Sequence, residues 1–231
     1  MTTLTFDIET IALPAELREA SRPTAETVKY GNTKDPGKRA AMVDAAVAAW
    51  ERGDKAALDP TQGQVCCIGW QASDVAACHM HLDPARGFHP DSEILCNFWD
   101  IVAAVYHMDR GNFRLVGHNI AGFDLPYLVR RSWILGVTVP VFILSEMNGY
   151  RSAMIVDTMR LWGFGDRNEF ITLDKLATLL GIPTQEGGVD GAGVGEAWAS
   201  GEAGQQQVVA HCLSDVRITG AIYERLTGGG E

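Results

Sequence analysis

Polar and apolar residues alternate along the first residues of the chain, as they do in a half-buried β-strand. Between Thr3 and Thr10 most residues are β-branched or aromatic, and such residues favour strands. Side chains two positions apart on a strand face the same side of a sheet. The pattern therefore predicts a strand that presents Asp7 and Glu9 on one face.

The rest of the chain contains apolar runs separated by segments in which apolar residues recur at helical spacing. The runs predict strands at 64–71, 74–81, 113–116 and 154–157, with the first two joined as a hairpin. Helical spacing predicts helices at 40–51, 92–105, 125–135, 173–180 and 205–226. This order of elements favours an α/β fold, in which helices cover both faces of a mixed β-sheet.

A glycine-rich stretch at about 187–204 precedes the last predicted helix. It contains no Gly-Lys-Ser/Thr sequence and follows no convincing strand, so it lacks the features of a phosphate-binding loop. We expect a mobile loop that leads into the helix.

Asp7 and Glu9 are candidate ligands of a divalent cation. Two adjacent carboxylates repel each other and lose hydration when they are buried, and a cation between them offsets both costs. Such hard oxygen ligands suit Mg²⁺ or Mn²⁺. An exposed acidic strand end would also explain the pair, so other residues must decide between the two interpretations.

Asp124 stands where the predicted strand at 113–116 gives way to a helix. An aspartate at this position can cap the helix by accepting hydrogen bonds from backbone N–H groups, which alone would explain it. Asn119 and Phe123, however, lie close to it in the sequence. An amide suits the phosphate or sugar of a nucleotide, and an aromatic ring can pack against it.

His211 and Asp215 are four residues apart in the last predicted helix. They therefore lie one turn apart on the same helix face. Taken alone, this spacing indicates a modest surface ion pair or a packed polar couple.

Together and in this order, the three segments resemble the DEDD superfamily of 3′→5′ exonucleases. The motifs of that superfamily are Asp-x-Glu, then Asn-x-x-x-Phe-Asp, then a base ahead of a final Asp, and all three are present. Segments at 57–65, 155–159 and 173–183 are similar to predicted exonucleases related to the proofreading domain of family B DNA polymerases. The resemblance implies a ribonuclease H-like fold, and the length predicts a single domain over residues 1–231.

The resemblance also implies roles for particular residues. Two divalent cations, Mg²⁺ or Mn²⁺, about 3.5–4 Å apart would be held by four carboxylates, those of Asp7, Glu9, Asp124 and Asp215. His211 would orient or deprotonate the attacking water. The substrate would be bound by Thr10, Asn119 and Phe123.

His211 departs from the pattern of the family. The polymerase-like branch carries Tyr-x-x-x-Asp in its third motif, and the other main branch carries His-x-x-x-x-Asp. Here a histidine stands at the tyrosine spacing, so either it replaces the tyrosine or the site is altered. Because the unperturbed pKa of histidine is about 6.5 and that of tyrosine about 10, histidine can accept a proton directly near neutral pH.

The function expected from these residues is 3′→5′ hydrolysis of single-stranded DNA, in proofreading or trimming. The chain carries 29 acidic and 19 basic residues, a formal net charge of −10, which disfavours binding of long duplexes by counterion release. It is compatible with gripping a few nucleotides at a single-stranded 3′ end, with DNA favoured over RNA. Two alternatives stay open: an exoribonuclease or oligonucleotide-trimming enzyme, and a non-catalytic nucleic-acid-binding module.

The expected partners and compartment follow from length and composition. The 231 residues leave no room for a polymerase domain, so a proofreading role would need a separate DNA polymerase or another replication or repair protein. Five cysteines without a Cys-x-x-Cys sequence indicate a reducing compartment, and we expect the cytoplasm of a bacterial or phage-infected cell. No signal peptide and no apolar run of membrane-spanning length is apparent, so no membrane partner is expected.

The segment at about 15–59 interrupts the α/β pattern. Its polar part contains Lys29, Lys34 and Lys38, and an alanine-rich helix follows. Two interpretations have similar weight. The segment either covers an edge of the sheet or forms a flap over a nucleic-acid groove, where it would add positive charge to an acidic body.

Overall fold

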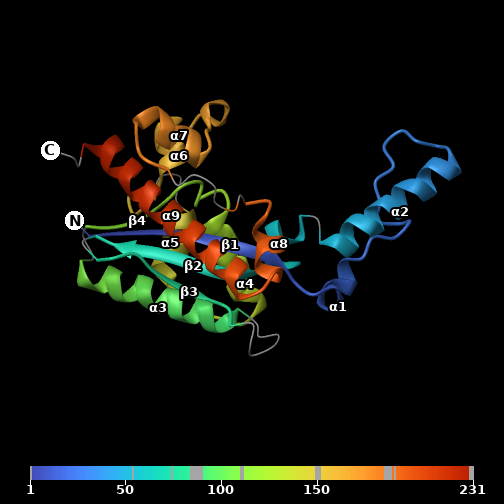
Figure 1. The fold of residues 1–231 in the computed structure, drawn as a ribbon, viewed down its shortest axis with the longest axis horizontal. Coiled ribbons are helices and arrows are strands. Elements are labelled where there is room, and N and C mark those ends of the chain that lie inside the picture. The colour runs from blue at the N-terminus through green and yellow to red at the C-terminus, as the bar shows by residue number, and fades with distance from the viewer. Residues whose placement is uncertain are drawn as a thin grey trace.

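The computed structural model describes residues 2–53, 55–73, 75–83, 91–109, 112–148, 152–184, 189 and 191–228. These residues form a mixed five-stranded sheet in the order β3-β2-β1-β4-β5 (Figure 1). The strands are β1 (Thr2–Ala12), β2 (Gly63–Ala72), β3 (Cys78–His81), β4 (Phe113–Gly117) and β5 (Ile155–Asp157). The α/β class predicted from the sequence is confirmed.

Helices connect and cover the strands. The α-helices are α1 (Ala15–Arg18), α2 (Pro36–Arg52), α3 (Ser92–Met108), α4 (Asp124–Ile134), α5 (Val141–Asn148), α6 (Thr158–Trp162), α7 (Leu173–Leu180), α8 (Val194–Ala199) and α9 (Glu202–Thr227). Short 3₁₀ turns are η1 (Glu19–Ser21), η2 (Ala56–Leu58) and η4 (Arg167–Glu169). None of the described helices is long and apolar enough to cross a membrane.

β1 lies in the middle of the sheet, antiparallel to β2 and parallel to β4. Its alternating pattern divides its side chains between the two faces, as the sequence predicts. Leu4, Phe6 and Ile8 enter the main hydrophobic core. Asp7 and Glu9 stand on the opposite face, where α9 lies.

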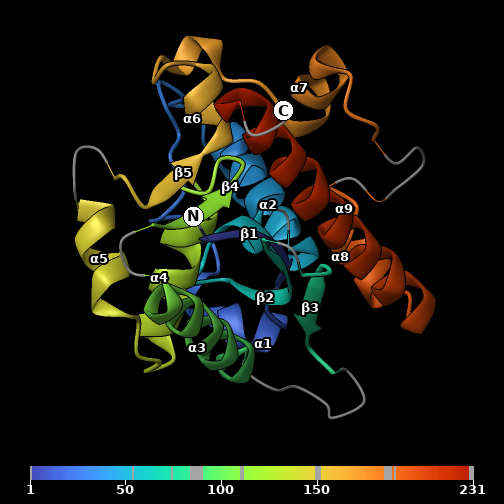
Figure 2. The same ribbon diagram turned by 90° about the vertical axis from the view of Figure 1, so that its left-hand side faces the viewer.

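The main core fills the space between the sheet and the pair α3 and α4. Phe98 of α3 packs on Phe6 with ring centroids 5.1 Å apart, and Leu128 of α4 is fully buried in the same cluster. α9 covers the other face, where it contacts β1, β2 and β4. Figure 2 shows α9 on one side of β1 and β2, and α3 with α4 on the other.

A buried ion pair ties this core together. Arg131 of α4 and Asp91, which precedes α3, are 2.9 Å apart from Nη2 to Oδ1, and their side chains are 4% and 0% exposed. The second oxygen of Asp91 accepts a hydrogen bond from the backbone N–H of Val65 in β2 at 2.9 Å. A single carboxylate therefore fixes α3, α4 and β2 relative to one another.

The structure differs from the sequence predictions in several elements. The second hairpin strand begins at Cys78 rather than at residue 74, which lies outside the described residues. The glycine-rich stretch, expected as a loop, contains α8 and the start of α9, because Val194 and Trp198 of α8 pack against Cys212 of α9. Residues 187, 188 and 190 of that stretch lie outside the described part of the chain. The short helices α5 and α6 were not predicted.

The segment at 15–59 has neither of the two positions considered for it. Figure 1 shows α2 and the loop before it projecting away from the body, rather than lying on a sheet edge or over the sheet. Asp35 caps α2 by accepting a hydrogen bond from the backbone N–H of Lys38, and Gly53 ends it in a left-handed conformation. Local sequence signals therefore set both ends of this helix, although few contacts to the body hold it.

Candidate active site

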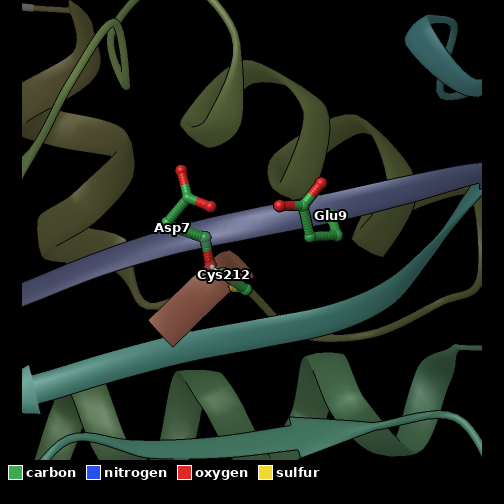
Figure 3. A group of neighbouring side chains, drawn as sticks. All are labelled: Asp7, Glu9 and Cys212. Carbon is green, nitrogen blue, oxygen red and sulfur yellow. Dashed lines mark hydrogen bonds between the residues drawn. The ribbon is translucent and has the colours of Figure 1, made fainter. Parts of the chain in front are cut away.

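β1 places Asp7 and Glu9 beside each other. Figure 3 shows both carboxylates projecting to the same side of the strand, with Cys212 on the α9 segment below it. A register shift in the pairing with β2 falls between Glu9 and Thr10, and such irregularities commonly re-aim side chains next to active sites. The predicted pair of adjacent acids is therefore present.

Glycine in β2 lets α9 approach these acids. Gly69 pairs with Asp7, and a Cβ at Gly69 would lie only 3.0 Å from Cys212 Sγ and 3.2 Å from Val216 Cγ2. Cys212 in turn donates a hydrogen bond from Sγ to the carbonyl oxygen of Asp7 at 3.5 Å. The close packing of α9 on the sheet thus sets the position of the helix face that carries the third motif.

Asp124 begins α4 and is 4% exposed. The parallel pairing of β1 with β4 runs only as far as Thr5 and Val116, so Ile8 lies beyond it. The backbone N–H of Ile8 instead donates to the Asp124 carboxylate. This hydrogen bond brings Asp124 to the β1 acids, as predicted, and the helix-capping interpretation alone does not account for it.

Asp157, at the end of β5, organises the turn that precedes Asp124. Its carboxylate accepts hydrogen bonds from the backbone N–H of Asn119 at 2.9 Å and of Ala121 at 3.1 Å. It also caps α6 by accepting from the backbone N–H groups of Met159 and Arg160. Its position in the sequence suggested polar punctuation, whereas the structure shows a residue that joins β5 to the loop of the second motif.

His211 and Asp215 lie one turn apart on α9, as predicted. The Nε2 atom of His211 is 3.5 Å from Glu9 Oε1, and its Nδ1 atom is 3.7 Å from Asp215 Oδ1. The imidazole therefore stands between the first and third motifs. It is an internal residue of the acidic cluster rather than half of an isolated surface ion pair.

Burial and mutual repulsion change the acidity of the four carboxyl groups. Burial, with Glu9 as the nearest charge, raises the pKa of Asp7 well above its usual range. Burial raises the pKa of Glu9 to about 8 and that of Asp124 to about 7. Burial also raises the pKa of Asp215 to about 6, although His211 opposes the shift. Without a cation, the cluster therefore resists full ionisation near neutral pH.

A cleft of about 790 Å³ opens over these residues. Its lining includes Asp7, Glu9, Thr10, Phe123, His211 and Asp215, so all but two of the predicted site residues reach it. Asp124 is buried beside the β1 acids. Asn119 is absent from the described lining, and its carbonyl oxygen instead accepts from the backbone N–H groups of Gly122 and Phe123.

The cleft also contains polar residues to which the sequence analysis gave no role. Asp174 of α7 faces Asp215 and contributes to the raised pKa of that group. Gln207 and Ser214 of α9 line the cleft as well. Gln207 is four residues before His211, so extending the helix face of His211 and Asp215 by one turn would have found it. Asp174 carried no such signal, because only the packing of α7 against α9 brings it near.

The composition of the site fits divalent cations. No Lys or Arg is present among the described residues that line the cleft, so the carboxylates have no permanent cationic partner there. Hard oxygen ligands in this number suit Mg²⁺ or Mn²⁺. Ligand atoms of Asp7, Glu9 and Cys212 also lie within 4.8 Å of one another. The thiol is a poor third ligand, because it donates to the Asp7 carbonyl and burial raises the pKa of Cys212 well above its usual range.

Comparisons with known proteins agree with this site. A family model described as a predicted 3′-5′ exonuclease related to the exonuclease domain of PolB matches residues 65–228. The matched segment includes Asp124, His211 and Asp215, whereas β1 with its two acids precedes it. No curated protein matches the chain.

A solved structure shows a similar fold. The family B DNA polymerase from the hyperthermophilic archaeon Pyrobaculum calidifontis matches 98% of this chain with a TM-score of 0.60 and 21% sequence identity. The chain spans 24% of the length of that polymerase. At this identity the likeness concerns the fold, and the predicted ribonuclease H-like arrangement is confirmed. The family match covers well over half of the residues, and the chain therefore belongs to the predicted 3′-5′ exonucleases related to the exonuclease domain of PolB.

Proposed function

We propose that the protein is a metal-dependent 3′→5′ exonuclease that removes nucleotides from single-stranded DNA with two divalent cations, Mg²⁺ or Mn²⁺. The observation that carries the proposal is the convergence of four carboxylates, from β1, α4 and α9, beside a cleft whose described lining has no basic residue. Such a cluster is unfavourable for a folded protein unless cations bind it.

The residues of the chain would divide the work in a simple way. The carboxylates of Asp7, Glu9, Asp124 and Asp215 would hold the cations. When bound, the cations would lower the pKa of a water and stabilise the leaving 3′ oxygen of the strand. His211 would accept the proton of that water, because its two ring nitrogens lie 3.5 and 3.7 Å from carboxylates that bind the cations.

The substrate would enter the cleft at its terminal nucleotide. Phe123 lines the cleft while its ring packs against the main core, so it offers a fixed aromatic surface for a base. Thr10 lines the same space and has a hydroxyl for the sugar or phosphate. Asn119 would act through the turn that carries Phe123, because its backbone holds that turn.

The preference for a single strand rests on charge. A formal charge of −10 disfavours the long phosphate contacts that a duplex-binding surface needs, whereas a single terminal nucleotide can be held by cations and stacking. Proofreading, with a separate polymerase or repair protein as partner, is the role proposed for the activity.

The test uses 5′-labelled single-stranded DNA and RNA oligonucleotides with Mg²⁺, Mn²⁺ or EDTA. We expect a ladder that shortens from the 3′ end of DNA only when a divalent cation is present. Asp7→Asn should lower the rate by more than about a hundredfold, which exceeds the 10–100-fold loss usual for residues that only orient metal ligands.

Asp44→Asn is the matched control, because Asp44 is an exposed acid of α2 outside the cleft. It should cleave at the parent rate. Faster cleavage of RNA than of DNA would transfer the proposal to an exoribonuclease. A folded protein that binds DNA without cleaving it in either metal would contradict the proposal and favour a binding module.

A further inference from the structure

We propose that the projecting arm, residues 22–52, binds the phosphate backbone of the substrate strand at a distance from the end that is cleaved. This inference rests on the proposed function and adds a second contact surface for the same nucleic acid. The arm precedes the segment matched by the family model, which begins at residue 65.

The tip of the arm is basic, in contrast to the rest of the chain. Residues 23–39 carry Lys29, Lys34, Lys38 and Arg39 against two acids, whereas acids outnumber bases by 29 to 19 over the whole chain. The three lysine side chains are exposed, and they make no ion pair with the described residues. Three ammonium groups without counterions on an acidic protein form a local attraction for a polyanion.

The tip also presents an aromatic ring stacked with a guanidinium group. The Cζ atom of Arg39 lies 5.0 Å from the centroid of the Tyr30 ring, and its Nε donates a hydrogen bond to the carbonyl oxygen of Thr33 at 2.7 Å. These contacts hold the loop against the start of α2. Stacked aromatic and guanidinium groups are surfaces on which bases of a single strand pack.

The base of the arm is rigid. Arg18 is 4% exposed and donates hydrogen bonds to the carbonyl oxygens of Leu13 and Trp50, both at 2.8 Å. Trp50 donates from Nε1 to Ser21 Oγ at 3.0 Å, and its ring lies under the guanidinium of Arg22. A fixed base gives the arm a defined direction without packing along its length (Figure 1).

The base adjoins the cleft, which favours the substrate strand over any other polyanion. η2 follows the arm in the chain, and its residues Ala57 and Leu58 line the cleft. The 17 residues of α2 span about 25 Å. A strand with its 3′ end in the cleft therefore reaches the basic tip only if it extends well beyond the terminal nucleotides.

This length dependence provides the experiment. Binding of labelled single-stranded DNA of about 4 and about 20 nucleotides is measured by fluorescence anisotropy in EDTA, over a series of salt concentrations. The triple variant K29A/K34A/K38A should bind the long strand about tenfold more weakly than the parent at low salt. Its plot of log K against log salt should be shallower by about 2, at about 0.7 per lost phosphate contact. The short strand should bind equally to both proteins.

A matched control removes the same charge elsewhere. The variant R167A/R217A/R225A loses three exposed basic residues that do not line the cleft, and it should bind the long strand like the parent. Equal binding of the long strand by K29A/K34A/K38A and the parent would overturn the inference and direct the search to an acidic protein partner. So would an equal loss for short and long strands.

The two proposals fail in different ways. Binding is measured without a cation, so a protein that cleaves nothing in Mg²⁺ would sink the proposed function and still leave the comparison of strand lengths readable. Conversely, unchanged binding by the triple variant would leave the 3′→5′ activity untouched.

Discussion

His211 lies at the centre of the acidic cluster, within 3.5 Å of a carboxylate oxygen of β1 and 3.7 Å of one of α9. The sequence placed it at a spacing at which related exonucleases carry tyrosine. The structure shows that this spacing puts the ring against Glu9 as well as Asp215, a position from which it can act on a water held between them.

We expect His211→Ala to lower the cleavage rate by about 10²–10³-fold, within the range that a general base contributes. His211→Tyr should retain more activity than His211→Ala at high pH, because a tyrosine there can still orient the water. The measurement is the single-turnover rate on 5′-labelled DNA over a pH series. Equal rates for the parent and His211→Ala at every pH would remove the histidine from the mechanism.

At the scale of elements, the loop between β4 and α4 depends on Asp157. One carboxylate accepts backbone hydrogen bonds from Asn119, Ala121, Met159 and Arg160, and it is 6% exposed. The turn that carries Phe123 and Asp124 is therefore held from β5, a strand that contributes no residue to the cleft lining.

Asp157→Ala should cost about 2–4 kcal/mol of the free energy of unfolding, because four buried backbone donors lose their acceptor. Asp157→Asn retains one acceptor oxygen and should cost less. Urea denaturation of the three proteins provides the comparison. A loss below about 0.5 kcal/mol for Asp157→Ala would show that other groups hold the loop.

The ion pair between Asp91 and Arg131 is the second element-scale constraint. Arg131→Met leaves a fully buried carboxylate without its cation, so we expect a loss of about 3–5 kcal/mol in the free energy of unfolding. Arg131→Lys keeps the charge but not the two-pronged hydrogen bonds, and should lose less. Denaturation in urea tests both, and a larger loss for Arg131→Lys than for Arg131→Met would contradict this account.

At the scale of the whole molecule, the acidic cluster couples folding to pH. Carboxyl groups whose pKa is raised in the folded state bind protons more tightly there than in the unfolded chain. Their contribution to stability is therefore complete below the unfolded pKa of about 4 and is lost as the pH rises through about 6 to about 8.

In EDTA we expect the free energy of unfolding to fall by roughly 1–3 kcal/mol between pH 6 and pH 8. Mg²⁺ should offset the loss at pH 8, because a ligand that binds only the folded state stabilises it by mass action. Asp7→Asn should be less dependent on both pH and Mg²⁺. Urea denaturation at the two pH values, with and without Mg²⁺, measures all three effects, and a metal-free parent that is equally stable at both would refute the coupling.

The sequence by itself determined the elements that follow from local periodicity. The alternation between Thr3 and Thr10 fixed which side of β1 carries Asp7 and Glu9, and the four-residue spacing of His211 and Asp215 fixed their common helix face. Strand and helix geometry depend on neighbouring residues alone, which is why these predictions hold before any tertiary contact is known.

The tertiary structure decided what no local pattern encodes. Asp174 reaches the cleft because α7 packs against α9, and Asp157 governs a loop some 36–38 residues earlier in the chain. α8 forms in a glycine-rich stretch because Val194 and Trp198 find apolar partners on α9. The direction of the arm depends on the buried contacts of Arg18 with Leu13 and Trp50. Each of these arrangements depends on contacts between residues distant in the sequence, whose free energy exists only once the sheet and α9 have brought them together.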